Sequence, residues 1–284
     1  MRKTLAVGFL AACATGLVAT SLVATPASAH RDDGPRVVGL TADNTLVTFS
    51  AASPGSTARI GRITGLKGDT KVVGIDFRVQ DRSLYAVGDK GGVYTLSGRA
   101  KATKVSQLTV ALQGTSFGVD FNPAANRLRV ISDTGQNLRH NLDDAMGAPA
   151  AGTTATDGTL TNPPVPPATT GLTALGVTGA AYTNNDLSPA TATTLFDVDT
   201  TADQVSVQSP ANAGTLAPTG KLGIDAGPVA GFDISSKVRG GVTVANTAYA
   251  ALNGRFYSVD VLTGQASLIG TFRVPVTDIA VTLG

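Results

Sequence analysis

The 284-residue chain contains no glutamate and no tryptophan, one cysteine and only two histidines. All 20 of its acidic residues are therefore aspartates. His140 is the one histidine inside the body of the chain, and a zinc site or a Ser-His-Asp relay needs more partners than this single imidazole provides. Acid–base or metal chemistry in this chain would have to depend mainly on aspartate.

The first 29 residues have the pattern of an export signal. Arg2-Lys3 precedes an apolar run from Leu5 to about Ala24, and Ala27-Ser28-Ala29 matches a small-residue cleavage site. We therefore expect cleavage after Ala29 and secretion. No later stretch approaches the roughly 18 apolar residues of a membrane-spanning helix, so the sequence predicts no transmembrane segment.

A lipoprotein is the competing interpretation of this leader. Leu10-Ala-Ala-Cys13 fits a lipid-attachment site, but the apolar run continues well past Cys13, which favours cleavage after Ala29. Cleavage there leaves 255 residues (284 minus 29) without cysteine, so the exported protein would have no disulfide. A chain of this length suits one large domain whose stability comes from its core.

The exported chain has no charge excess. Removing Arg2 and Lys3 from the 22 basic residues leaves 20, which balance the 20 aspartates. A protein that binds nucleic acid through its phosphates normally carries a basic patch and a positive net charge. We therefore expect no nucleic-acid partner.

The residues that are abundant point to an all-β fold. Glycine, threonine, valine, asparagine and aspartate suit strands and turns rather than helices. A short motif of a small residue, an apolar residue, Asp and an aromatic or apolar residue recurs at intervals of 44, 61, 52 and 45 residues. Its copies are Gly74-Ile-Asp-Phe77, Gly118-Val-Asp-Phe121, Gly179-Ala-Ala-Tyr182, Gly231-Phe-Asp-Ile234 and a degenerate Val276-Thr-Asp-Ile279. These intervals fit the blades of a β-propeller.

Each interval contains an inner strand, two hairpin strands and a weaker outer strand. Asn253-Gly254, between two alternating runs, is the strongest hairpin signal because both residues accept positive φ angles. The N-terminal unit lacks an inner strand, and residues 276–282 supply one without partners. We therefore predict a single propeller of five four-stranded blades, closed by pairing the N- and C-terminal strands. Six blades, or an open sandwich of similar strands, remain alternatives.

The predicted organisation is a leader at 1–29, a short tail at 30–35 and one propeller domain at 36–284. Residues 145–173, rich in Pro, Gly, Ala and Thr, interrupt the repeat pattern. We interpret them as a long surface loop that carries at most one short outer strand near Asp157 to Thr161.

Two motifs that could indicate catalysis have simpler interpretations. Gly114-Thr-Ser116-Phe-Gly118 matches the G-x-S-x-G pattern of a hydrolase nucleophile, but that pattern requires a helix after the serine, and here a strand is predicted. His140 is expected at the end of a strand on the surface. Neither motif supports a serine hydrolase.

Aspartates could hold a metal ion in two places. Asp197, Asp199 and Asp203 surround a turn and are weak candidates for calcium, although the glycine and glutamate of a calcium loop are missing. A solvated hairpin turn is the favoured alternative for these three residues. The repeated Asp76, Asp120 and Asp233 could line the central channel and bind a cation there. The alternative for the channel is structural, with each aspartate accepting hydrogen bonds from the backbone at the inner end of its blade.

The most concentrated polar cluster is Asp133-Thr-Gly-Gln136-Asn137-Leu-Arg139. The blade alignment places it in a loop between the second and third strands, on the same face as four similar loops. Arg139 could hold a carboxylate or sugar hydroxyls. With Asp120, these side chains are the predicted binding residues, and the alternative is a turn held by its own side chains.

The same stretch carries a family resemblance. Phe117-Gly-Val-Asp-Phe-Asn-Pro123 and Arg127-Leu-Arg-Val-Ile-Ser-Asp-Thr-Gly-Gln-Asn-Leu-Arg139 resemble secreted bacterial proteins of the domain of unknown function 4394 family. Supporting segments are Gly39-Leu-Thr-Ala-Asp-Asn44, Ala181-Tyr-Thr-Asn-Asn185, Ala211-Asn-Ala-Gly-Thr-Leu216 and Gly231-Phe-Asp-Ile234. The resemblance implies an exported, propeller-like domain and supplies no catalytic residues.

These observations lead to two hypotheses about function. The first is a secreted, non-catalytic propeller that binds an extracellular carbohydrate or protein, or serves as a scaffold, without a cofactor. The second is an extracellular propeller hydrolase or lyase that uses the channel aspartates with Arg139, with Ca²⁺ as its candidate cofactor. A purely structural cell-wall component is a third alternative.

Overall fold

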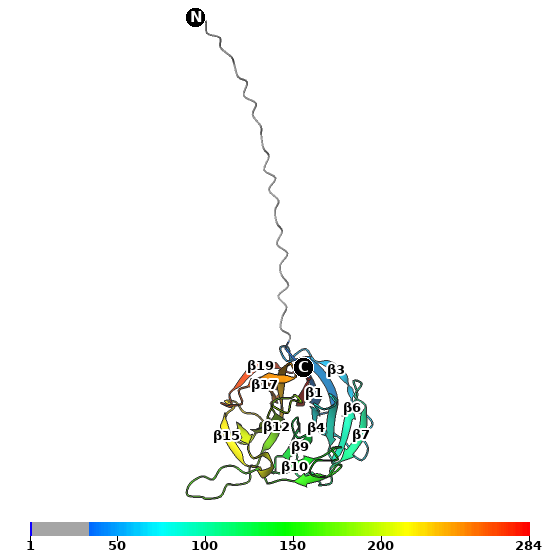
Figure 1. Cartoon of the computed structure of the whole chain (residues 1–284), viewed down its shortest axis with the longest axis vertical. Coiled ribbons are helices and arrows are strands. Elements are labelled where there is room, and N and C mark those ends of the chain that lie inside the picture. Colours follow the sequence, from blue (N-terminus) through cyan, green and yellow to red (C-terminus); the bar gives the residue numbers. More distant parts are fainter. Residues whose placement is uncertain (2–33) are drawn as a thin grey trace. The chain divides into compact units, whose positions relative to one another are not determined.

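The computed structural model describes residue 1 and residues 34–284, and its strands form five four-stranded antiparallel sheets. Within these residues there is no α-helix, and one short 3-10 turn spans Ala211–Ala213. The sheets are arranged around a common axis as the blades of a propeller (Figure 1). The predicted five-bladed all-β fold is confirmed, whereas the predicted leader and its cleavage site lie outside the described residues.

We number the blades from the N-terminal one and give the inner strand of each first. Blade 1 is β20 (Val276–Val281), β1 (Arg36–Thr41), β2 (Thr45–Ser50) and β3 (Ala58–Arg62). Blade 2 is β4 (Val72–Phe77), β5 (Leu84–Gly88), β6 (Gly92–Leu96) and β7 (Ala102–Gln107). Blade 3 is β8 (Phe117–Asn122), β9 (Arg127–Ser132), β10 (Asn137–His140) and β11 (Thr154–Thr156). Blade 4 is β12 (Val177–Tyr182), β13 (Leu195–Asp199), β14 (Gln204–Gln208) and β15 (Leu216–Lys221). Blade 5 is β16 (Ala230–Arg239), β17 (Val242–Leu252), β18 (Arg255–Val259) and β19 (Ala266–Thr271).

Blade 1 closes the ring as predicted. Its inner strand β20 pairs antiparallel with β1, from Val37 opposite Val281 to Leu40 opposite Asp278. The inner strands contact one another in the order β20, β4, β8, β12, β16 and back to β20. Closure leaves no inner sheet edge open to pair with another chain.

The hydrophobic core consists of five clusters, one between each pair of neighbouring blades. Phe49 of blade 1 packs edge to face against Phe256 of blade 5, with ring centroids 5.2 Å apart. Tyr85 of blade 2 packs in the same manner against Phe121 of blade 3, at 5.0 Å. Because each blade buries both faces against its neighbours, the inner strands are held at fixed positions around the axis.

Two features differ from the sequence-based expectation. The short outer strand of the 145–173 loop is β11 at Thr154–Thr156, before the predicted Asp157–Thr161 segment. The hairpin of β16 and β17 extends past the end of β18 as residues 235–247, which the repeat pattern did not include. Among the described residues, no helix is long and apolar enough to cross a membrane.

Candidate functional site at the central channel

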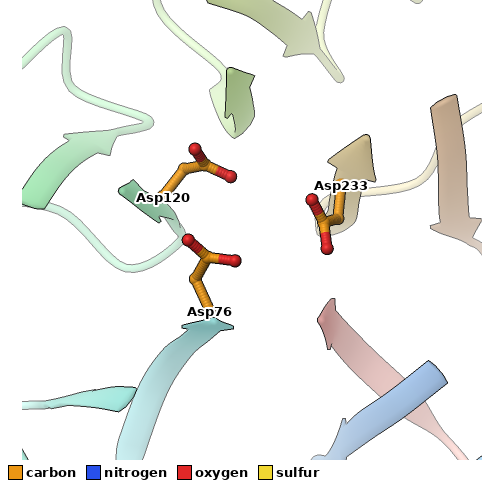
Figure 2. A group of neighbouring side chains, drawn as sticks. All are labelled: Asp76, Asp120 and Asp233. Carbon is orange, nitrogen blue, oxygen red and sulfur yellow. The ribbon is translucent and has the colours of Figure 1, made fainter. Parts of the chain in front are cut away.

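Three aspartates meet near the propeller axis. Asp76 of β4, Asp120 of β8 and Asp233 of β16 each offer one carboxylate oxygen, and these oxygens lie within 4.8 Å of one another. Figure 2 shows the three carboxylates directed toward a common space between the inner strands. Among the described residues, this is the one group of three acidic, histidine or cysteine side chains close enough to share a metal ion. The structure therefore brings together the channel aspartates that the repeat pattern singled out.

Strand register shows which residues are equivalent around the ring. In blade 2, Asp76 pairs with Tyr85, and Gly74, two residues earlier on the same strand, pairs with Val87. In blade 1, Asp278 pairs with Leu40, and this pair occupies the position of the Gly74–Val87 pair. The residue of β20 that corresponds to Asp76 is Ala280. The sequence motif is therefore misaligned by two residues in blade 1, and Asp278 is a fourth aspartate one level away from the other three.

The carboxylates join neighbouring blades by accepting backbone hydrogen bonds. Asp76 Oδ2 accepts the N–H of Phe121 at 2.7 Å, and Asp120 Oδ1 accepts that of Tyr182 at 3.1 Å. Asp233 Oδ2 accepts the N–H of Val281, so each of the three reaches the same position on the next inner strand. This geometry corresponds to the structural role considered from the sequence. Aspartate at these positions stabilises the ring by satisfying buried N–H groups.

The positions that lack this aspartate are compensated locally. Blade 4 has Ala181 at the position equivalent to Asp76, so no side chain there can accept the N–H of Ile234 on the next inner strand. Asp233 Oδ1 accepts this N–H instead. Asp278, at its different level, accepts the N–H of Ile75 at 2.7 Å. The four buried aspartates thus connect blades 1, 2, 3, 4 and 5 through short backbone contacts.

Burial makes the ionised form of these aspartates costly. Desolvation raises the pKa of Asp76, Asp120 and Asp278 well above the usual aspartate value, and repulsion between the carboxylates adds to it. Desolvation raises the pKa of Asp233 to about 6. A bound cation would relieve the repulsion, and oxygen ligands of this kind suit Ca²⁺. Calcium usually takes six to eight oxygens, however, and here several are already committed to N–H groups.

The channel opens on the face where the inner strands begin. A 180 Å³ cavity there is lined by Val73 of β4, Phe117 of β8, Val229 and Thr277 of β20. Val73 precedes Asp76 by three residues, so the carboxylates lie about 10 Å deeper along the strand. An adjoining cavity of 450 Å³ shares Thr115 and Ser116 with the first. We call the two cavities together the channel mouth.

Hydroxyl groups dominate the larger cavity of the channel mouth. Its lining includes Thr115, Ser116, Thr178, Thr200 and Thr201, together with the predicted binding residue Asp133 and the exposed Leu175. Because Ser116 is followed by strand β8 rather than by a helix, and its Oγ donates to Pro228 O at 3.3 Å, the G-x-S-x-G match has no nucleophile geometry.

Although Asp133 lines the channel mouth, its carboxylate is engaged in hydrogen bonds with Thr115. Its carboxylate accepts the N–H of Thr115 at 2.9 Å and the Thr115 hydroxyl at 2.6 Å. Asp89 of blade 2 makes the same pair of bonds to Thr70, both at 2.7 Å. The repeat of this contact in two blades shows that Asp133 fastens the loop that leads into the inner strand of its own blade.

The other members of the predicted polar turn point away from the channel mouth. Gln136 bonds the backbone of Gln113 and Ala111. Asn137 is buried and donates to Gly158 O and Ala211 O. Arg139 pairs with both Asp157 oxygens, at 3.0 and 3.1 Å, and donates to Ala148 O. Asn137 and Arg139 thus fix the 145–173 loop to blades 3 and 4, and Gln136 holds the segment before β8.

His140 is buried, which corrects its expected surface position. One ring nitrogen lies 2.8 Å from Ser106 Oγ of blade 2 and the other 2.9 Å from Thr154 Oγ1 of β11. Burial lowers the pKa of His140 to about 4. A histidine enclosed in this way is neutral at physiological pH and touches no cavity at the channel mouth.

The weak calcium candidates do not converge. Asp199 accepts the N–H groups of Thr201 and Ala202, and Asp203 accepts that of Ala226. Asp197 is fully buried, and within residues 34–284 neither of its oxygens has a hydrogen-bond partner. Burial raises its pKa well above the usual value. The expected solvated turn is therefore wrong for Asp197 and Asp199, which are buried in strand β13.

Several solved structures are similar in their backbone. One is PorZ, a surface component of the type-IX secretion system of Porphyromonas gingivalis, at 18% identity and a TM-score of 0.40, covering 85% of this chain and 28% of that one. Another is an auxiliary nutrient binding protein from Bacteroides thetaiotaomicron, at 14% identity and a TM-score of 0.42, covering 84% of this chain and 59% of that one. The chain thus spans less than two thirds of the length of both.

No curated protein sequence matches the chain. The family described as "Domain of unknown function (DUF4394)" matches residues 45–280, which is most of the propeller, from the start of β2 into β20. The resemblance noted in residues 117–139 is therefore confirmed. The chain belongs to the domain of unknown function 4394 family.

Proposed function

We propose that this chain is an exported, non-catalytic binding or scaffold module whose ligand contacts the channel mouth. The observation that supports this proposal is the 450 Å³ cavity with its hydroxyl-rich lining. Its volume lies within the range of roughly 300–1,000 Å³ that small-ligand sites occupy. The channel aspartates Asp76, Asp120 and Asp233, in contrast, are not part of the lining of either cavity of the channel mouth.

The lining favours a neutral, polar ligand. The hydroxyls of Thr115, Ser116, Thr178 and Thr200 donate within the protein and keep lone pairs that can accept from a ligand. Acceptors of this kind suit the hydroxyl groups of a carbohydrate or the N–H groups of a peptide backbone. Leu175, which is 60% exposed, adds an apolar contact at the rim. The ligand is therefore an extracellular carbohydrate or peptide segment held by several weak hydrogen bonds around one apolar anchor.

The test is a titration of residues 30–284 with soluble oligosaccharides and cell-wall peptides, with binding measured by calorimetry. Leu175→Arg places a long charged side chain over the cavity and should weaken binding about tenfold or more. Val105→Arg, at a 49% exposed position of β7, is the matched control and should bind normally. Equal affinity of both variants would refute the proposed site. Enzyme-like turnover of esters, lactones or glycosides would refute the non-catalytic role.

The competing candidate is a calcium-dependent extracellular hydrolase or lyase that uses the channel aspartates. The cluster of Asp76, Asp120 and Asp233 is the observation in its favour. This candidate predicts that calcium raises the melting temperature of the protein, and that Asp120→Asn abolishes both this effect and an activity while the fold stays intact. Arg139, committed to Asp157 and Ala148, no longer belongs to this hypothesis.

A further inference from the structure

A second groove lies at the opposite ends of the inner strands, between blades 1 and 2. Its volume is 470 Å³, and its floor consists of apolar side chains that include Ile60 and Leu46 of blade 1 and Phe77 of blade 2. Ile60 and Phe77 are partly exposed and pack on the core cluster between these blades. An apolar floor of this size can take up a hydrocarbon or aromatic group.

Two cations border this apolar floor. Arg82, from the turn between β4 and β5, and Lys101, immediately before β7, both line the groove and are exposed. Within residues 34–284, neither side chain forms an ion pair with an aspartate, and no aspartate lines the groove. The groove therefore combines an apolar floor with two positive charges that no aspartate neutralises.

Arg82 is held in place at the rim. Its Nη2 donates to Leu283 O at 3.1 Å and to Gly284 O at 2.9 Å, and no hydrogen bond within residues 34–284 uses its Nε or Nη1. The guanidinium is thus positioned by one nitrogen and keeps donors for another acceptor. Lys101 contributes a flexible ammonium group, which can follow the anion.

The repeat provides an internal comparison. The groove between blades 4 and 5 is built from equivalent positions. Leu84 is the first residue of β5 that pairs with β6, and Ala248 is the first residue of β17 that pairs with β18, so these two residues correspond. By the same register, Arg82 and Lys101 correspond to Asn246 and Gln265. That groove also contains Asp260, where the blade 1/2 groove has Ser97. Positive charge is therefore a property of the blade 1/2 groove and not of the blade architecture.

We propose that the groove between blades 1 and 2 binds a small organic anion that carries an apolar group, such as a medium-chain carboxylate. The carboxylate would accept hydrogen bonds from Lys101 and Arg82, and the apolar chain would lie over Ile60 and Phe77. Charge complementarity selects this class over a neutral ligand, which would offer no anionic acceptor to Lys101 or to the remaining donors of Arg82. This site is separate from the channel mouth and does not depend on it.

The test uses octanoate as the probe and 1-octanol as its neutral counterpart, with binding followed by amide NMR shifts of residues 34–284. A site with a dissociation constant of about 1 mM would be mostly occupied at about 10 mM probe. Octanoate should shift amides of residues 77–84 and 95–103 and leave those of 258–267 unchanged, and octanol should bind at least about tenfold more weakly.

Variants separate specific recognition from general charge. Lys101→Gln and Arg82→Gln should each weaken octanoate binding about tenfold, because each removes a charge-assisted hydrogen bond. Lys90→Gln is the matched control, since Lys90 is an exposed lysine of the same blade outside the groove. The proposal is overturned if octanoate causes no shifts, if octanol binds equally well, or if Lys101→Gln binds like Lys90→Gln. Failure of the channel-mouth titration would leave these results unaffected.

Discussion

The carboxylate of Asp76 accepts the backbone N–H of Phe121 at 2.7 Å, so a side chain of blade 2 satisfies a donor on the inner strand of blade 3. The same relationship joins Asp120 to Tyr182 and Asp233 to Val281. The repeated aspartate thus connects neighbouring blades through its carboxyl group, which is buried where ionisation is unfavourable. We therefore expect the stability of the protein to depend both on the hydrogen bonds that these carboxylates accept and on the pH at which the carboxylates ionise.

Asp76→Ala should destabilise the protein by about 1–3 kcal/mol, because the Phe121 N–H would be buried without an acceptor. Asp76→Asn should cost much less, since its amide oxygen can still accept this bond while the repulsion with the other carboxylates disappears. The free energies of unfolding of both variants can be measured by urea denaturation. A loss for Asn as large as that for Ala would show that the charge, and not the hydrogen bond, stabilises the ring.

Stability should decrease as pH rises through the titration of Asp233. Burial raises the pKa of this carboxyl to about 6, compared with about 4 in the unfolded chain. The folded state therefore binds more protons between these values, and its stability falls over this window by about 2–3 kcal/mol. The melting temperature of Asp233→Asn relative to the unsubstituted protein should increase from about pH 4 to about pH 7. A difference that is constant with pH would contradict the assignment.

His140 should remain neutral throughout the physiological range. Its pKa is lowered to about 4 by burial, so the unfolded state, with a pKa near 6.5, binds the extra proton first on acidification. The stability due to this group is thus lost as pH falls from about 6.5 through about 4. The imidazole NMR signals of His140 measured across this range should show no titration above about pH 5. A midpoint near 6.5 would mean that the contacts with Ser106 and Thr154 are open in solution.

Arg129 and Arg139 should differ sharply when they are replaced. Arg129 is 2% exposed and donates to Asn137, Asp157 and Asn212, so Arg129→Met should cost about 3–5 kcal/mol. Arg139→Ala should cost about 1 kcal/mol, since its side chain is partly exposed and Asp157 keeps Arg129. Urea denaturation tests the order, with Arg36→Ala as a surface control. Loss of ligand binding by Arg139→Ala without loss of stability would restore its predicted binding role.

The repeat pattern was sufficient to predict the fold because each inner strand has a compact apolar motif of its own. Asn253 and Gly254 illustrate the local signals, since both adopt the positive φ angles, 46° and 75°, that the predicted hairpin turn requires. Asp278 was aligned with Asp233 because the letters match, whereas the pairing of β20 with β1 sets a register two residues away. Register depends on the partner strand, and a motif of four residues does not contain that information.

The candidate site was only partly predictable, for a similar reason. The channel aspartates were found through their repetition. The polar turn at 133–139 was singled out because its residues suit ligand binding, but the partners of Asn137 and Arg139 come from residues 148–158 and 211, remote in sequence. The same side chains that can bind a ligand can also hold a loop, and the choice depends on tertiary neighbours.

The pairing of β20 with β1 has a consequence for how the protein is made. β1 is near the start of the chain, and its inner neighbour, Val276–Val281, is synthesised after all the other strands. Until those last residues are available, β1 presents an unpaired edge and the Asp233 carboxylate has no Val281 N–H to accept. The ring therefore closes only when the last strand pairs with the first. A chain that stops before Val276 would be an open row of blades, with the edge of β1 exposed for pairing with another chain.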